Sequence, residues 1–368
     1  MLKEAIPLSV TEPDLERVAR QRLREALCAV PFITLAAPES EAGSTAPSDF
    51  TVALEAAGAP WTLVCEAKRH AQPRHVREAV YQLRHRLLTL RSLSVYGVFI
   101  APYLSDESVA VLREESMGYL DLAGNCFLSF DSVFIERRGA PNLPVRRRAL
   151  RELFAPKASR VLRVLLTDPD HAWRVTDLAH SAGVSLGQAS NVRRALLDRE
   201  WATVDPSGVR LKNPNAVLDA WRSQYQAPVL SETHYYTLLH GASLESALRA
   251  AFAAPGADQH LLLSSFSAAQ WLAPFARVPG HFFYADAKGE ASIKAALQLE
   301  SVSRGANVMV SRPKDDGVAI DRRPLAEGLW STGPVQTYLD LAIAGDRGQE
   351  AADHLRRETL EPAWRHHP

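Results

Sequence analysis

The sequence predicts an α/β protein with several domains, and three stretches of the chain indicate this class. Residues 61–65 are mostly apolar, as in a buried strand, and further helix and strand patterns surround them. Residues 159–212 combine helical patterns and a short turn with a hairpin pattern. Helical and strand patterns alternate again after residue 226. A chain of 368 residues has room for two or three domains, and we expect them at 1–143, 144–225 and 226–368.

Composition sets limits on the partners and the compartment. The formal net charge is +0, so any nucleic-acid surface must be local rather than a property of the whole chain. The three cysteines, Cys28, Cys65 and Cys126, form no C-x-x-C pair, and we expect buried, reduced thiols. No apolar run approaches the roughly 18 residues of a membrane span. Abundant Arg, Ala and Leu with few Lys are typical of a GC-rich bacterial genome. We therefore expect a cytoplasmic bacterial protein without membrane contact.

The first region alternates helices and strands. A helix begins after Thr11, a plausible N-cap, because apolar residues then recur at helical spacing. Gly58-Ala59-Pro60 is expected to turn a hairpin, and Gly124-Asn125 a later strand pair. The expected strands are residues 31–37, 50–55, 61–65, 94–101 and 119–130, and the later helices are residues 73–91 and 105–117.

An acid and an amine follow the buried strand 61–65. Strand side chains alternate between the two faces, so Glu66 and Lys68 should point the same way while Ala67 points into the core. Asp49 precedes the other strand of the hairpin. Two acids can hold a divalent metal, and a lysine can orient water or stabilise charge on a phosphate. This set therefore indicates phosphodiester chemistry.

The same residues resemble the PD-(D/E)XK nuclease family, which has the restriction-endonuclease-like α/β fold. The family signature is an acid after a Pro-containing turn, a hairpin, and then acid-X-Lys; here these are Asp49 and Glu66-Ala67-Lys68, with Ser48 between Pro47 and the acid. Several branches place a Gln in the following helix, as Gln82 stands here. The resemblance implies that Asp49 and Glu66 hold Mg²⁺ or Mn²⁺, that Lys68 positions water, and that Gln82 supports the site.

Several charged residues near this motif have two interpretations. The basic helix at residues 73–91 is either a solvated face or part of a DNA-backbone contact. Asp121 is either a further acid of the cleft or a turn-stabilising Asp. Glu16 or Glu25 is either a further metal ligand or a surface charge, and the surface charge is the preferred interpretation. The segment Asp286-Ala287-Lys288 repeats the acid-X-Lys pattern without the upstream acid hairpin, and we interpret it as a strand end.

A basic stretch follows the predicted linker at residues 139–144 and leads into the second region. Phosphate contact is the preferred interpretation of this stretch. Its candidate contact residues are Arg146, Arg147, Arg148, Lys157 and Arg160.

The second region resembles a winged helix-turn-helix domain. Helical patterns at 159–167, 176–182 and 186–199 come first, with Thr176 as the expected cap of the second helix and Gly183-Val184-Ser185 as the turn before the third. Residues 201–212 form the expected wing, which carries Arg210. Side chains of the third helix that suit base edges and phosphates are Ser185, Gln188, Ser190, Asn191, Arg193 and Arg194. The alternative is a winged helix that contacts only proteins.

The third region contains Pro334-Val335-Gln336-X-Tyr338-X-Asp340-Leu341, an Arg-Gly-X-Glu-Ala-Ala turn from Arg347, and an earlier Ser-X-X-Ala-Ala segment at 265–269. It resembles the C-terminal domain of AbiEi-type antitoxins of type IV toxin–antitoxin systems. The resemblance implies promoter repression and an opposing nucleotidyltransferase-like toxin. We expect Gln336, Asp340, Arg347 and Glu350 to brace a helix junction rather than to do chemistry.

Two functions follow from these patterns. The first is a DNA-binding transcriptional regulator, antitoxin-like, that carries a restriction-endonuclease-like domain. The alternative is an active Mg²⁺-dependent DNA endonuclease targeted by its winged helix, since Asp49, Glu66 and Lys68 are all present. A pure protein-interaction module would leave the third-helix residues without a role. The expected partners are double-stranded DNA, a second copy in a homodimer, and a toxin protein.

Overall fold

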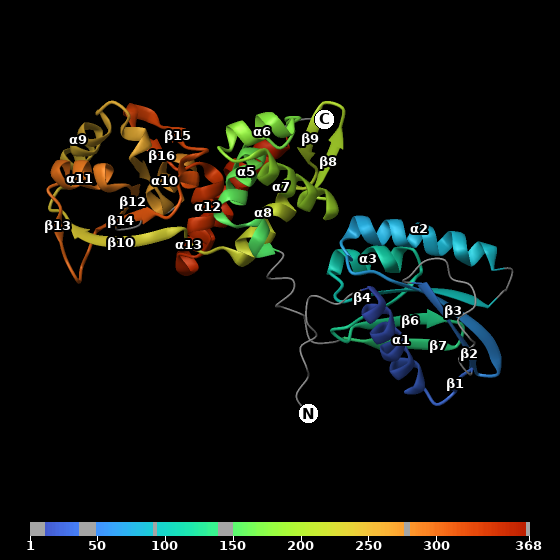
Figure 1. Ribbon diagram of the computed structural model, residues 1–368. Coiled ribbons are helices and arrows are strands. Elements are labelled where there is room, and N and C mark those ends of the chain that lie inside the picture. The colour runs from blue at the N-terminus through green and yellow to red at the C-terminus, as the bar shows by residue number, and fades with distance from the viewer. Residues whose placement is uncertain (1–11, 37–48, 91–93, 139–149, 276–279, 366–368) are drawn as a thin grey trace. The chain divides into compact units, whose positions relative to one another are not determined.

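The computed structural model describes residues 12–36, 49–90, 94–138, 150–275 and 280–365 (Figure 1). The chain forms two compact units, one comprising Met1–Arg148 with Asp198–Glu200 and the other comprising Ala149–Leu197 with Trp201–Pro368. Each unit contains its own seven-stranded sheet with helices beside it. The protein is therefore a mixed α/β protein with several sheets, as the alternating patterns predict.

The first unit is built on one sheet in which the strands follow chain order from β1 to β7. Strands β3, β4 and β5 run parallel, and their neighbours on both sides pair antiparallel. The carboxyl ends of three central strands therefore meet at one edge. The elements are α1 (Glu12–Cys28), β1 (Ile33–Leu35), β2 (Asp49–Ala56), β3 (Ala59–Ala67), α2 (Pro73–Thr89), β4 (Val95–Ala101), α3 (Asp106–Glu114), β5 (Gly118–Asp121), β6 (Cys126–Phe130) and β7 (Val133–Arg137).

Both faces of this sheet are buried because its strands alternate between two apolar clusters. Leu63, Cys65 and Ala67 pack in a cluster with residues of α1, whereas Val64 packs in a second cluster with residues of α2 and α3. The helices α1 and α2 accordingly cover opposite faces (Figure 1). The predicted inward orientation of Ala67 is confirmed, since only 1% of the residue is exposed.

The hairpin of β2 and β3 turns one residue earlier than predicted. Its two central residues are Ala57 and Gly58, with φ of 50° and 85°, while Pro60 is already paired with Glu55. Two-residue hairpin turns need positive φ at this point, and glycine adopts it without steric cost. Pro60 was misassigned to the turn because a proline usually interrupts a strand.

The second unit begins with three helices and a two-stranded hairpin and continues into another seven-stranded sheet. The order of that sheet is β13-β10-β14-β12-β11-β16-β15. The first part comprises α5 (Pro156–Thr167), α6 (Val175–Ser181), α7 (Leu186–Asp198), β8 (Ala202–Asp205), β9 (Gly208–Leu211) and α8 (Pro214–Gln224). The second part comprises β10 (Val229–Tyr236), α9 (Gly241–Phe252), β11 (Leu261–Leu263), α10 (Ser265–Leu272), β12 (His281–Ala285), α11 (Ala287–Ala296), β13 (Glu300–Ser301), β14 (Val308–Pro313), β15 (Arg323–Pro324), β16 (Trp330–Ser331), α12 (Pro334–Ala342) and α13 (Gly345–Leu355).

The two parts of the second unit share one apolar cluster. Leu162, Leu196 and Trp221 from the first part pack in the same cluster as Tyr338 and Leu355 from α12 and α13. The predicted boundary at residue 225 therefore runs through a continuous core. The predicted boundary at residue 143 lies outside the described residues. The three-domain division stays a prediction.

Most predicted helices and strands are present, but some details were wrong. Helix α6 starts at Val175 after Arg174 without a side-chain cap, so Thr176 is not the cap. Helix α10 begins after Ser264, its N-cap residue. Cys65 and Cys126 are buried as expected, but Cys28 is exposed at the end of α1. Strands β7 and β10 were missed because their apolar and polar residues do not form long runs.

We expect the core of the first unit to depend on Leu63. A Leu63→Ala variant should lose about 2–5 kcal/mol of unfolding free energy, because the fully buried leucine leaves a cavity. The matched control is Leu88→Ala, since Leu88 is 84% exposed and should lose little. Urea denaturation followed by circular dichroism measures both. Equal losses in the two variants would contradict the described packing.

Candidate functional sites

The predicted pair of Glu66 and Lys68 meets at the carboxyl end of β3. The Lys68 Nζ atom lies 2.9 Å from Glu66 Oε1. The Glu66 side chain is 1% exposed, whereas the Lys68 side chain is 36% exposed. The backbone N–H of Lys68 donates to the Ile100 carbonyl at 2.9 Å, which fixes the strand end against β4. The pair therefore consists of a buried carboxylate and a cation that reaches solvent, as the strand alternation predicts.

The other two residues of the predicted catalytic set differ in their placement. The backbone of Asp49 lies directly opposite Glu66 in the β2–β3 register. The side chain of Asp49 is not among the described parts of the structure. Gln82 is exposed on α2, whose buried residues include Val76, Val80 and Leu83. The backbone thus brings Asp49 to Glu66, while Gln82 points to solvent.

The Asp121 carboxylate is hydrogen-bonded mainly within its own turn. Its carboxylate accepts hydrogen bonds from Asn125 N at 2.9 Å, from Asn125 Nδ2 at 2.7 Å and from Leu104 N at 3.2 Å. Burial raises its pKa, although these hydrogen bonds oppose the rise. The interpretation as a turn-stabilising Asp is the one that this geometry supports.

The acids of the first helix are paired on its surface. Glu16 accepts from Arg20 at 2.7 Å, and Glu25 accepts from Arg22 at 3.2 Å. Within the described ranges, no group of three or more His, Cys, Asp or Glu side chains is arranged to hold a metal ion. Glu16 and Glu25 therefore behave as surface charges.

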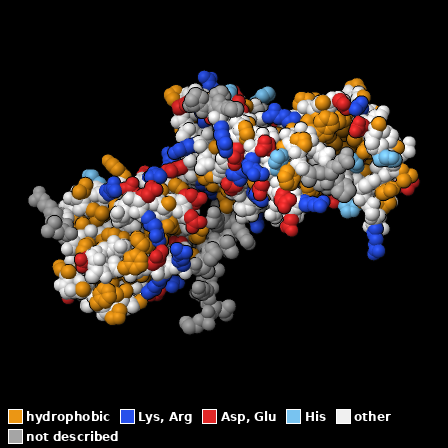
Figure 2. All heavy atoms as spheres, turned by 180° about the vertical axis from the view of Figure 1, so that it is seen from behind, with side chains coloured by type: hydrophobic (Ala, Val, Ile, Leu, Met, Phe, Trp, Pro, Cys, Tyr) orange, Lys and Arg blue, Asp and Glu red, His pale blue; other side chains and the backbone are white. Residues whose placement is uncertain are grey.

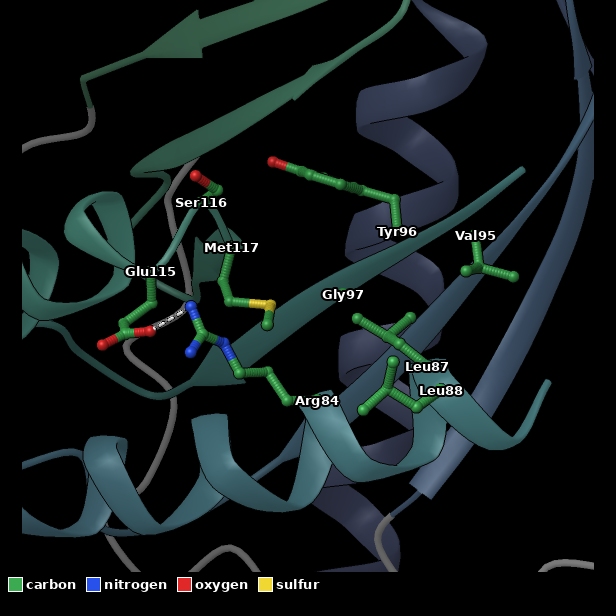
Figure 3. Close-up of a pocket in the computed structure, with 9 residues that line it drawn as sticks. All are labelled: Arg84, Leu87, Leu88, Val95, Tyr96, Gly97, Glu115, Ser116 and Met117. Carbon is green, nitrogen blue, oxygen red and sulfur yellow. Dashed lines mark ion pairs between the residues drawn. The ribbon is translucent and has the colours of Figure 1, made fainter. Parts of the chain in front are cut away.

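A separate pocket of about 370 Å³ lies at the other end of the sheet (Figure 3). It is lined by Val95, Tyr96 and Gly97 at the start of β4, whereas Glu66 pairs with Phe99 farther along that strand. Arg84 of α2 and Glu115 point toward one another at this pocket, with Arg84 Nη2 2.5 Å from Glu115 Oε2 (Figure 3). The pocket is thus distinct from the Glu66–Lys68 pair.

In the second unit, the turn before α7 has the predicted geometry. Gly183 has φ of 59°, a conformation that glycine adopts readily. The Ser185 Oγ atom accepts from Gln188 N at 3.2 Å and so caps α7. Ala189, Val192 and Leu196 of α7 are buried.

The outward side of α7 carries the polar residues that the sequence singled out. Asn191 and Arg194 are exposed, while Gln188, Ser190 and Arg193 are partly buried. Residues 191 and 194 are three positions apart and therefore share one side of the helix. Asn191 and Arg194 are the most accessible of the predicted DNA contacts on α7.

Arg160 is not the open phosphate contact that its charge suggested. Its Nε donates to Asp315 Oδ1 at 2.7 Å and its Nη2 donates to Asp315 Oδ2 at 2.9 Å, and its side chain is only 15% exposed. The side-chain hydrogen bonds to Asp315 raise the pKa of Arg160. Lys157 is 64% exposed, with Nζ 3.9 Å from the same carboxylate. Arg146, Arg147 and Arg148 lie outside the described residues.

Arg210 stabilises the hairpin from within. It forms an ion pair with Asp205, and it donates to the Asp170 carbonyl at 2.9 Å and to Ser207 Oγ at 3.1 Å. Hydrogen bonds from Ser207 lower the pKa of Asp205 to about 2. The Arg210 side chain, a predicted DNA contact, therefore already forms hydrogen bonds and an ion pair with its own hairpin and with Asp170.

The acid-X-Lys repeat at Asp286 is a helix start. Strand β12 ends at Ala285, and the Asp286 carboxylate caps α11 by accepting from Lys288 N and Gly289 N at 2.8 Å and 2.9 Å. Strand β12 ends directly before Asp286, so the interpretation of this segment as a strand end is confirmed.

The four polar residues of the C-terminal motif separate into two pairs. Gln336 and Asp340 are buried and hydrogen-bonded to each other at 2.8 Å, as a helix junction requires. Arg347 and Glu350 are exposed on α13. Sequence reasoning missed Arg163 and Tyr225, which contact the buried pair, because both lie more than a hundred residues away in the chain.

Acidic and basic side chains do not form separate patches on the face of the molecule that Figure 2 shows. Figure 2 shows acidic and basic side chains interspersed on one face, which agrees with the formal net charge of +0. Among the described helices, none is both long enough and apolar enough to cross a membrane.

Comparisons with known proteins give only weak likenesses. No family model and no curated protein matches the chain. The apo structure of EndoMS is matched with 19% identity and a TM-score of 0.23 over 30% of this chain. The Megavirus polyadenylate synthase is matched with 9% identity and a TM-score of 0.26 over 97% of this chain and 68% of that chain. The chain spans 46% of the EndoMS chain, and at these TM-scores neither likeness identifies a function.

We expect the Glu66–Lys68 ion pair to stabilise the first unit. A Lys68→Ala variant should lose about 1–2 kcal/mol of unfolding free energy, because a buried carboxylate then lacks this cation. Adding Glu66→Gln to Lys68→Ala should restore part of the stability. An unchanged stability in Lys68→Ala, or no recovery in the double variant, would contradict the described ion pair.

Proposed function

We propose that this protein binds double-stranded DNA through α7 and acts as a transcriptional regulator of the antitoxin-like kind. The order of α5, α6, α7 and the β8–β9 hairpin supports a winged helix-turn-helix. The glycine turn at Gly183 and the capped start of α7 at Ser185 support it further. In such domains the third helix enters the major groove.

The observation that carries this proposal is the accessible pair Asn191 and Arg194 on α7. An asparagine suits the edge of adenine, and an arginine suits guanine or a phosphate. The buried Ala189, Val192 and Leu196 hold the opposite side of the helix on the core. The rigid scaffold would therefore present both side chains without a large conformational cost.

Replacing Arg194 by Ala should weaken DNA binding by about ten- to a hundredfold and reduce the salt slope of log Kd by about 1. Fluorescence anisotropy with a labelled duplex at several salt concentrations measures both quantities. The duplex is first selected from a random pool with the unmodified protein.

The matched control is Arg249→Ala. Arg249 is also a partly exposed surface arginine of the second unit, with 46% of its side chain accessible, but it lies on α9. Its replacement should leave both the affinity and the salt slope unchanged. Equal effects of the two variants would refute α7 as the DNA-binding helix.

A second candidate function is metal-dependent DNA cleavage, which the Glu66–Lys68 pair favours. The donor set fits a hard divalent cation, because Glu66 brings a buried carboxylate and the strand register brings Asp49 opposite it. Asp49 and Glu66 would hold the ion, which would supply Lewis-acid stabilisation of the phosphate. Lys68, which reaches solvent, would orient the attacking water or hold the phosphate oxygen.

Under this second function, Lys68→Ala should reduce Mg²⁺- or Mn²⁺-dependent nicking of supercoiled plasmid by about a hundredfold or more. Chelation of the metal should abolish the nicking. The matched control is Lys288→Ala, which removes the exposed lysine of the other acid-Ala-Lys segment and should have no effect. DNA binding without nicking in the unmodified protein would leave the regulator function alone.

The remaining partners follow from the antitoxin-like proposal. A toxin protein would bind the C-terminal part of the second unit, and a homodimer would read two half-sites of an operator. Both belong to this proposal and rest on the sequence patterns.

A further inference from the structure

The strongest unassigned feature is a buried polar cluster around Asp340 in the second unit. The Asp340 Oδ1 atom accepts three hydrogen bonds, from Tyr225 OH at 2.5 Å, from Gln336 Nε2 at 2.8 Å and from Tyr284 OH at 3.0 Å. These donors come from the end of α8, from α12 itself and from β12. The cluster thus joins three separate elements at one carboxylate.

Arg163 connects this cluster to α5. It is 2% exposed, and its Nη2 donates to Gln336 Oε1 while its Nη1 donates to Ser159 Oγ at 2.9 Å. The guanidinium also lies 4.9 Å from the centre of the Trp221 ring on α8. A buried arginine needs negative charge or aromatic faces around it, and here it receives both.

A second buried carboxylate, Asp321, lies at the start of α12. It is 7% exposed, and a Cβ placed on Gly333 would come 2.1 Å from its Oδ2 atom. Among the described residues, neither oxygen of Asp321 has a hydrogen-bond partner, and neither does Oδ2 of Asp340. Buried carboxylate oxygens without donors disfavour the charged form.

The charges of the buried groups do not cancel when every group is ionised. Asp321 and Asp340 contribute two negative charges and Arg163 contributes one positive charge, whereas Arg323, the other cation that acts on Asp321, is exposed. Tyr225 and Tyr284 stay neutral donors, because burial raises the pKa of each well above 10. The other charged residues at this junction pair with one another: Arg222 with Asp353 at 2.9 Å, and Arg356 with Asp219 at 2.5 Å.

We propose that Asp340 is a proton-linked latch, in which one bound proton stabilises the packing of α12 against α5 and α8. Protonation removes the excess negative charge, and the Oδ1 atom keeps its three donors. Deprotonation leaves the buried carboxylates Asp321 and Asp340 with Arg163 as the single buried cation beside them. The latch therefore loosens when the proton leaves.

The direction of the pH effect follows from burial. Burial raises the pKa of Asp340 from 3.8 to about 6, and the hydrogen bonds and Arg163 only oppose this rise. The folded state therefore binds the proton more tightly than the unfolded chain does. The resulting stabilisation is complete below about pH 4 and is lost as the pH rises to about 6 and above. Burial raises the pKa of Asp321 in the same direction.

Hydrogen–deuterium exchange of the full chain tests this latch locally. The protection factors of α12 amides, corrected for intrinsic exchange, should fall between pH 4.5 and pH 7.5 by up to about thirtyfold, the limit that a pKa raised from 3.8 to about 6 sets over this range. In Asp340→Asn, which keeps the accepting oxygen without the charge, the part of this fall that Asp340 causes should disappear, while any part that Asp321 causes should remain. The control Asp353→Asn removes a carboxylate from the same junction and should behave like the unmodified protein.

The outcomes separate cleanly and do not depend on DNA binding. The same fall in the unmodified protein and in Asp340→Asn overturns the latch, and so does the lack of any fall in the unmodified protein. If Asp340→Asn does not fold, Tyr225→Phe serves instead. Loss of this donor to the charged form should move the midpoint of the fall to higher pH, and an unchanged midpoint overturns the proposal.

Discussion

A charge removed from water needs a partner or must be neutralised by a proton, and both units of this protein are arranged around that constraint. In the first unit, the buried carboxylate of Glu66 is paired with Lys68, whose side chain is partly exposed. In the second unit, Arg163 is enclosed by Gln336, Ser159 and Trp221. The surrounding strands and helices contribute the apolar walls that make such pairing necessary.

The Glu66–Lys68 pair and the cluster around Asp340 differ in their access to solvent. The Glu66–Lys68 pair has an open side, because the Lys68 side chain is 36% exposed. The cluster around Asp340 is closed, since Gln336 is fully buried and Asp340 is 8% exposed. An accessible charge pair suits the binding of a ligand, whereas an inaccessible one acts on the fold itself. The same chemistry thus supports a site in one unit and a junction in the other.

Sequence patterns correctly predicted the structural features that are set by residues close together in the chain. Strand alternation placed Glu66 and Lys68 on one side and Ala67 in the core, and the Gly183 turn with the Ser185 cap followed from side-chain chemistry within a few positions. Contacts between distant segments were beyond such patterns. The Arg160–Asp315 and Arg163–Gln336 contacts each join residues more than 150 positions apart, and no spacing rule links them.

This limit decides how a basic stretch is interpreted. Arg160 and Arg194 look alike in sequence, yet Arg160 makes two hydrogen bonds to Asp315 and Arg194 stays exposed. Breaking a bidentate, mostly buried ion pair to bind a phosphate exchanges one charge-assisted contact for another and gains little. An exposed arginine loses only mobile counterions and rotamer freedom, and release of DNA counterions favours the contact. Under the proposed DNA-binding function, Arg194 should therefore contribute more to the affinity than Arg160 does.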